Sequence, residues 1–148
     1  MQTNDLDIKS GVDVINAEAA ALKQLAEELD HNFTDAVELL VGIKGRTVVS
    51  GMGKSGHIAR KVAATMASTG SPAHFVHPGE CSHGDLGMIT TDDAILAISY
   101  SGNTAELADL IEYARRYSVP LVSITRDAGS TLAKAANGAE IAALERRM

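Results

Sequence analysis

The chain has 148 residues, a length typical of one compact domain. Hydrophobic residues make up 45% of it but aromatic residues only 3%, so the core must be aliphatic. The formal net charge of −6 argues against a nucleic-acid partner, because that function would need a basic face. The single cysteine, Cys81, excludes a disulfide framework and favours a reducing compartment. We see neither a leader-like start nor a run of about 18 apolar residues, and therefore expect a cytoplasmic protein without membrane association.

Two helices are predicted in the first 45 residues. The first carries apolar residues at alternating spacings of three and four, a heptad stripe formed by Val12, Ile15, Ala19, Leu22, Ala26 and Leu29. This stripe packs either on its own domain or against a second subunit, and the sequence leaves both open. A second helix is indicated by Phe33, Val37, Leu40 and Val41, with Gly45 expected at the position just past its end.

Strands and helices then alternate along the chain. Strands are predicted at 47–50, 73–77, 95–99, 121–125 and 139–144, with helices between them. The helices are expected around Ile58 to Met66, ending at Gly70, around Leu107 to Ala114, and around Leu132. Such alternation predicts an α/β fold in three α-β-α layers, with a parallel sheet between the helices. Ligands of such sheets bind beyond the carboxyl ends of the strands, so the loops at 51–55, 78–87, 99–104 and 126–130 are the candidates.

The first of these loops is Gly51-Met52-Gly53-Lys54-Ser55-Gly56. Its G-x-G-x-x-G spacing resembles a dinucleotide fingerprint, but the second strand is not followed by the expected acidic residue. A P-loop is excluded because Val48 stands where a glycine is required. The remaining interpretation is an anion site: Gly53 lets the backbone approach, Lys54 supplies charge, and Ser55 opens the helix. The alternative is a plain strand–helix turn with a solvated lysine and a capping serine.

The loop Ser99-Tyr100-Ser101-Gly102-Asn103-Thr104 joins a buried strand to a helix. Hydroxyl groups at a helix start form a phosphate cradle without a fixed charge, which predicts binding by Ser99, Ser101, Gly102, Asn103 and Thr104. The alternative is a capping box between Asn103 and Glu106, which would explain one of these polar groups and not the rest.

The loop from His77 to Asp85 contains two histidines, one cysteine and two acids. A metal site is one interpretation, but the spacing matches no closed zinc pattern, and we expect no metal. His83 is a candidate general acid or base because imidazole titrates near neutral pH. A hydrogen-bonded structural histidine is an equal alternative.

Three long motifs, in this order, resemble the sugar isomerase (SIS) domain of arabinose-5-phosphate isomerases. They are Gly51-Met52-Gly53-Lys54-Ser55-Gly56-His57, then His77-Pro78-Gly79-Glu80 with Ser82-His83-Gly84-Asp85-Leu86-Gly87-Met88, and finally Ser99-Tyr100-Ser101-Gly102. The resemblance runs from about residue 10 to about residue 140, so residues 1–148 are expected to form one SIS domain. It implies a flavodoxin-like five-stranded parallel sheet and a tetramer. We expect no cofactor, and a homodimer or homotetramer as the assembly.

The same resemblance implies interconversion of D-arabinose 5-phosphate and D-ribulose 5-phosphate, a step toward Kdo in lipopolysaccharide or capsule. It gives Lys54 and Glu106 catalytic roles and His83 an active-site role, and it places Ser55, Ser99, Ser101 and Thr104 around the phosphosugar. We expect proton transfer through a cis-enediol. Glu106 or His83 would serve as base and acid, while Lys54 would bind the phosphate or stabilise the enediolate.

The family pattern also includes a later active-site Glu, a later His, and paired CBS domains in longer members. The chain reaches Met148 where the first of these segments should begin, so the sequence predicts intact binding with impaired turnover. A different class is a sugar-phosphate-sensing module without catalysis, as in some transcription regulators. That interpretation would need a helix-turn-helix before the domain, for which the first 45 residues are too few. A dinucleotide-dependent oxidoreductase is the third candidate.

Overall fold

The computed structural model describes residues 3–136 and 140–142. The chain divides into two units, one formed by residues 1–29 and 144–148 and the other by residues 30–143. In the first unit, residues Thr3–Glu28 form the helix α1, which confirms the first predicted helix. The heptad stripe is exposed along this helix, and Val12, Ile15 and Leu22 each expose at least half of their surface.

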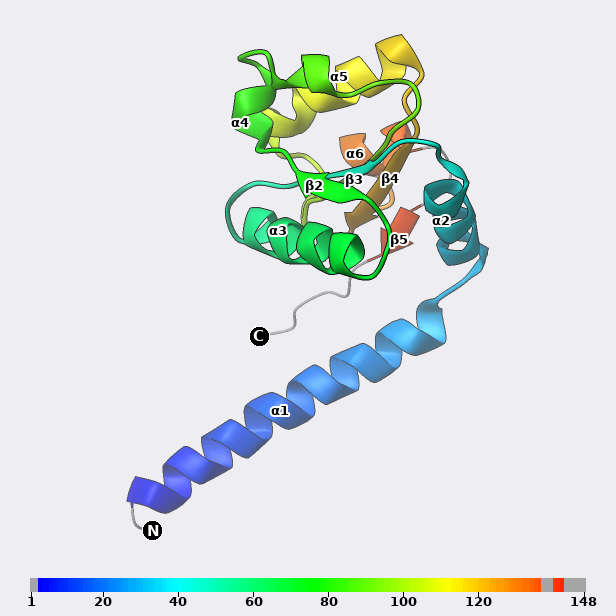
Figure 1. Ribbon diagram of the computed structural model, residues 1–148. Helices are drawn as coiled ribbons and strands as arrows, with labels where there is room; N and C mark the ends of the chain where they lie inside the picture. Colours follow the sequence, from blue (N-terminus) through cyan, green and yellow to red (C-terminus); the bar gives the residue numbers. More distant parts are fainter. Residues whose placement is uncertain (1–2, 137–139, 143–148) are drawn as a thin grey trace. The chain divides into compact units, whose positions relative to one another are not determined.

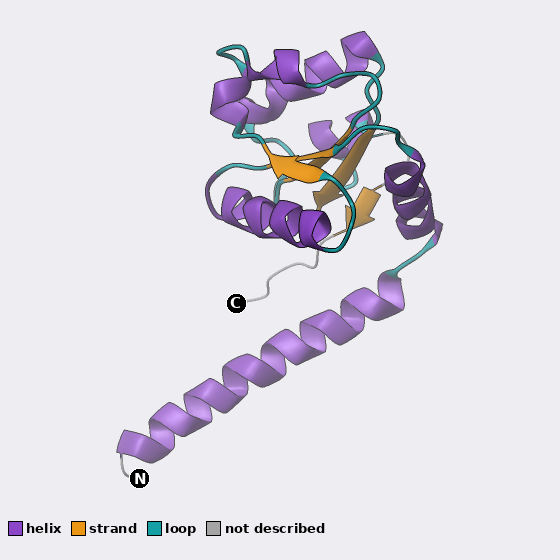
Figure 2. Ribbon diagram, in the orientation of Figure 1, coloured by secondary structure: helices purple, strands orange, loops and turns teal. Residues whose placement is uncertain are grey.

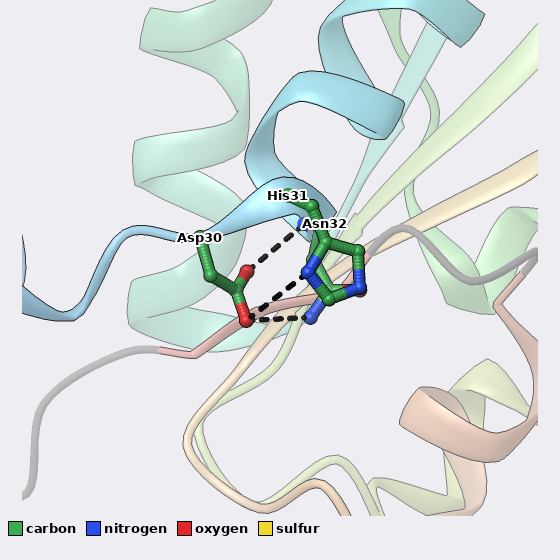
Figure 3. Close-up of polar contacts among 3 residues, drawn as sticks. All are labelled: Asp30, His31 and Asn32. Atoms are coloured by element: carbon green, nitrogen blue, oxygen red, sulfur yellow. Dashed lines mark hydrogen bonds and ion pairs between the residues drawn. The ribbon is translucent and has the colours of Figure 1, made fainter.

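The second unit begins with the helix α2, His31–Gly42. Asp30 caps it: one carboxylate oxygen accepts a hydrogen bond from the backbone N–H of Asn32 at 2.9 Å, and the other accepts from its side-chain amide at 3.2 Å, with the His31 ring alongside (Figure 3). The prediction that Gly45 follows the helix end was wrong, because α2 ends at Gly42. Gly45 instead lies in a tight turn, where an added Cβ would collide with the Asp93 carboxylate.

Five parallel strands form one sheet in the order β2-β1-β3-β4-β5 (Figures 1 and 2). They are β1 Thr47–Ser50, β2 Ala73–Phe75, β3 Ala94–Ile98, β4 Leu121–Thr125 and β5 Glu140–Ala142. The register pairs Val49 with Leu96, and Ile98 with Ile124. This order is that of flavodoxin-like sheets, which confirms the expected fold class.

Helices cover both faces of the sheet, as the predicted three layers require. On one face, Ile95 and Ala97 pack against Leu107 and Leu110. On the other face, the β-strand residues Val49, Leu96 and Val122 pack against Ala36 of α2 and Ala59 and Ala63 of α3. Figure 1 shows α3 (Gly53–Ser68) below the sheet and α5 (Ala108–Tyr117) above it. The carboxyl ends of β1, β3 and β4 therefore lie side by side along one edge, called here the carboxyl edge.

Short helices occupy most of the segment that follows β2, which the sequence predicted as a loop. They are α4 Pro78–Cys81 and the 3₁₀ helix η1 Asp85–Met88; further along the chain lie η2 Ala105–Leu107 and α6 Thr131–Ala135. The strand β2 ends two residues before the predicted boundary, because His77 caps α4 through its ring nitrogen Nδ1, which accepts from Gly79 N at 3.1 Å. Within the described ranges, no helix is long and apolar enough to cross a membrane.

Candidate functional site

The amino end of α3 faces the carboxyl edge of the sheet. Met52, not Ser55, occupies the N-cap position, and its side chain makes no capping hydrogen bond. The prediction that Ser55 opens the helix was therefore off by three residues. Gly56 N donates to Met52 O at 3.2 Å, which is the first hydrogen bond of the helix. The N–H groups of Gly53, Lys54 and Ser55 come before it and have no acceptor within the helix. They form the positive end of a 16-residue helix, which suits an anion.

Two glycines bring this turn against the end of β3. A Cβ on Gly51 would lie 2.9 Å from the carbonyl oxygen of Ile98, and one on Gly56 would lie 2.5 Å from the carbonyl oxygen of Gly51. Both distances are too short for a side chain, so the motif needs glycine at each position for packing. The loop after β1 is thereby seated next to the loop after β3.

The loop after β3 gathers hydroxyl groups, as the sequence predicts. The hydroxyl oxygens of Ser99 and Thr104 lie 2.8 Å apart, and Gly102 N donates to Ser99 Oγ at 3.1 Å. Ser99 is buried and Thr104 half-buried. The exposed Ser101 accepts from Asn103 N at 3.2 Å. We call residues 99–104 the hydroxyl cradle; Ser99 and Thr104 converge in it, while Ser101 lies toward the solvent.

The hydroxyl cradle is fastened to the start of α6. Asn103 Oδ1 accepts from Thr131 N at 3.0 Å, and the carbonyl of Gly102 accepts from Leu132 N at 3.0 Å. Gly102 has a φ of +65°, and a Cβ there would collide with the Ser130 side chain. The capping-box alternative was wrong, because η2 has Thr104 at its N-cap and no side-chain capping bond, while the Asn103 side chain accepts from Thr131 N. Spacing could not reveal that partner, which lies 28 residues away along the chain.

The turn that carries His83 is held beside the helix that carries Glu106. His83 is exposed, and its N–H donates to the Glu80 carbonyl at 2.9 Å. The helix α4 packs against η2 and α5, and the Ser82 hydroxyl donates to the Asp109 carboxylate. Glu106 and Lys54 are exposed as well. The three predicted catalytic residues thus follow three neighbouring strands, β1, β2 and β3, on the carboxyl edge.

Cys81 does not supply a reactive thiol to this edge. Burial raises the pKa of its thiol to about 11, and the negative charges of Asp85 and Asp109 act in the same direction. The thiol is therefore protonated at neutral pH, where neither nucleophilic attack nor metal binding is favoured. Across residues 3–136 and 140–142 no group of three or more His, Cys, Asp and Glu side chains is placed to hold a metal.

A surface pocket of about 410 Å³ lies at the opposite, amino edge of the sheet. It is lined by the end of α2, by residues 91–93 and by Pro120, and its charged groups include Glu38, Asp92 and Asp93 against Lys44. Three carboxylates against one ammonium group repel a phosphate. This pocket is therefore not a second candidate for the anion site.

A flavodoxin-like sheet with polar loops and a helix start at its carboxyl edge defines a class of α/β domain whose ligands bind beyond the carboxyl ends of the strands. The SIS domain model matches residues 40–146, and the chain belongs to this family. It is 51% identical over 129 residues to arabinose 5-phosphate isomerase KdsD of Pseudomonas aeruginosa, and 50% identical over 129 residues to that of Escherichia coli K12.

These alignments cover 87% of this chain but about 40% of each relative, so the chain spans well under half of their length. Among solved structures, one from E. coli CFT073, described as a complex with arabinose 5-phosphate, superposes with a TM-score of 0.88. That structure is 37% identical, and the match covers 96% of this chain and 74% of the other.

Proposed function

We propose that this chain is the sugar-phosphate-binding domain of an arabinose-5-phosphate isomerase. The observation that carries the proposal is the hydroxyl cradle, where Ser99 and Thr104 converge beside the amino end of α3. Backbone N–H groups, hydroxyls and one lysine together hold a phosphate without a metal. The relatives named for arabinose 5-phosphate, and the related structure described with that sugar phosphate, favour it as the ligand.

The proposed reaction is aldose–ketose isomerisation between D-arabinose 5-phosphate and D-ribulose 5-phosphate. A base moves a proton between C1 and C2 through a cis-enediol, while a cation or N–H group holds the developing oxyanion. Glu106 and His83 are the candidate base and acid, since they lie on adjacent, packed elements. Lys54, at the start of α3, is placed either for the phosphate or for the enediolate.

Binding is tested by thermal unfolding of this chain with and without D-arabinose 5-phosphate. A ligand that binds only the folded state at 100 times its Kd adds about 2.7 kcal/mol, which corresponds to a rise of roughly 5 °C or more in Tm. Unphosphorylated arabinose is the control and should give no shift. If no phosphosugar raises the Tm, the anion site is not formed as proposed.

Turnover is tested separately, by deuterium uptake from D₂O into the sugar at C1 or C2. Lys54→Ala should weaken binding, whereas Glu106→Gln should keep the thermal shift and abolish exchange. Lys61→Ala, at another exposed lysine of α3, is the matched control and should change neither. Exchange by the unmodified chain is expected to be slow but measurable; binding with no exchange at all would instead support a sensing module.

We also propose that the heptad stripe of α1 forms a contact with a second copy, giving a dimer or tetramer. A helix that exposes valine, isoleucine and leucine side chains gains stability when a partner covers them. The buried Cys81 suits a reducing compartment, and we expect the protein to act in the cytoplasm.

A further inference from the structure

Arg126 stands at the carboxyl edge and has no role in the site described so far. It directly follows β4, and Tyr100 lies two residues beyond β3. Ser99 N donates to Ile124 O at 3.0 Å, which continues the β3–β4 pairing by one residue. Arg126 N then donates to Tyr100 O at 3.2 Å, one residue further along than the register of Ile98 with Ile124 would give. Arg126 therefore lies beside Tyr100, which is part of the hydroxyl cradle.

The two side chains form a stacked pair. The guanidinium carbon of Arg126 lies 5.0 Å from the centre of the Tyr100 ring, and one of its nitrogens lies 3.5 Å from the phenol oxygen. This stacking fixes a flexible side chain, so less entropy is lost when the guanidinium meets an anion.

The last strand side chains before the pair lie on the α3 side of the sheet. Ile98 and Ile124, two residues earlier in each strand, both pack in the cluster that includes Ala59 of α3. Tyr100 and Arg126 follow these strand ends in bends, at the same carboxyl edge as the amino end of α3.

Lys54 and Arg126 consequently bracket the hydroxyl cradle. The strand order puts β3 between β1 and β4; Lys54 follows β1, the cradle follows β3, and Arg126 follows β4. Neighbouring strands lie about 4.8 Å apart, so the two loops that carry these cations flank the loop that forms the cradle. We infer that Arg126 is a second cationic binding residue, which holds the phosphate group of the sugar from the side opposite Lys54.

This inference rests on the proposed function and adds a second positive charge to the proposed phosphate site. A phosphate monoester carries close to two negative charges at neutral pH, and the guanidinium fork matches its oxygens in geometry. In a chain whose net charge is −6, two cations at one edge supply the local positive potential that such a ligand needs.

The test compares dissociation constants for D-arabinose 5-phosphate and for inorganic phosphate, measured by calorimetry at low and high salt. Arg126→Ala should weaken binding of both about tenfold, the effect of losing one charge-assisted hydrogen bond, and should flatten the salt dependence. Arg126→Lys should restore most of the affinity, because the charge returns.

Arg116→Ala is the matched control. Arg116 stacks in the same way on Tyr117, 5.6 Å from its ring centre, but at the end of α5 that leads into β4, on the amino edge. It should leave affinity and salt dependence unchanged. Unaltered binding by Arg126→Ala, with the unmodified chain binding normally, would overturn this inference alone. No binding by the unmodified chain would overturn the proposed function and this inference with it.

Discussion

Gly102 is the residue on which the hydroxyl cradle depends most directly. Its φ of +65° lies in the left-handed region, and its Cα sits against Ser130 and Thr125. Its N–H donates to Ser99 and its carbonyl accepts from Leu132, so one residue joins the end of β3 to the start of α6. Glycine is the residue type that adopts this backbone conformation without strain and needs no room for a Cβ atom.

Gly102→Ala should therefore lower the free energy of unfolding by about 2–4 kcal/mol, the sum of a strained φ and an overpacked Cβ. Urea unfolding measures this directly. Gly87→Ala is the control, because Gly87 has no atom within 4 Å of the new Cβ and no positive φ. Equal stability of the two variants would mean that the cradle rearranges at no cost.

At the scale of single residues, the sequence predicted which polar groups form the candidate site but not which residues those groups contact. The cluster of hydroxyls at 99–104 was visible because the residues are consecutive. The bond from Asn103 to Thr131 and the stack of Arg126 on Tyr100 were not, because each joins residues far apart in the chain. The signal available for Arg126 was its position directly after a buried strand, in a loop already marked as a candidate.

At the scale of elements, Asp93 ties the amino ends of β1 and β3 together. One carboxylate oxygen accepts from Arg46 N at 2.7 Å; the other accepts from Thr90 N at 2.7 Å and from the Thr90 hydroxyl at 3.0 Å. Burial alone would raise the pKa of Asp93, but these bonds, with a smaller effect of His74, bring it below its ordinary value of 3.8.

Because the folded pKa is the lower one, the unfolded chain binds the proton more readily, and stability is lost as pH falls below about 4. Asp93→Asn should cost about 1–3 kcal/mol at neutral pH, since it turns an amide donor toward a backbone N–H. The difference in free energy of unfolding between Asp93→Asn and the unmodified chain should become smaller at acidic pH. The neighbouring, exposed Asp92 gives the control Asp92→Asn, with little effect at any pH; a pH-independent deficit for Asp93→Asn would contradict the assignment.

Element types were predictable from sequence because buried parallel strands are short apolar runs between glycine-rich turns. The predicted strand 121–125 matches β4 at both ends. The segment after β2 was not predictable as helical, because its first turn depends on the His77 ring accepting from Gly79 rather than on any periodicity.

At the scale of the whole molecule, the alternation of strands and helices along the chain predicts parallel strand pairing and two helical layers, but it does not predict the order of the strands. That order came from the family resemblance, and it decides the site, since it sets β3 between β1 and β4. Lys54, Ser99 and Arg126 share one edge because the strands are parallel, and that order makes the loops that carry them neighbours.

The proposed self-association should respond to charge on the heptad stripe. Replacing Ile15 and Leu22 together by Glu should shift the chain to monomers in sedimentation velocity, because each carboxylate would be buried without a partner. Lys23→Glu, adjacent to the stripe and exposed, should leave the oligomer intact. A monomer for the unmodified chain at micromolar concentration would contradict the proposal.

The stack at the mouth of the cradle has an optical consequence. The chain has no tryptophan and three tyrosines, and two of these, Tyr113 and Tyr117, lie 4.5 Å apart on α5. Tyr100 is the tyrosine beside the proposed ligand, with a guanidinium over its ring. Binding of a charged ligand there would perturb the near-ultraviolet signal of Tyr100, and the chain has no tryptophan whose signal would overlap with it. Occupancy can therefore be followed in the unlabelled domain by near-ultraviolet circular dichroism, and Tyr100→Phe should remove that signal.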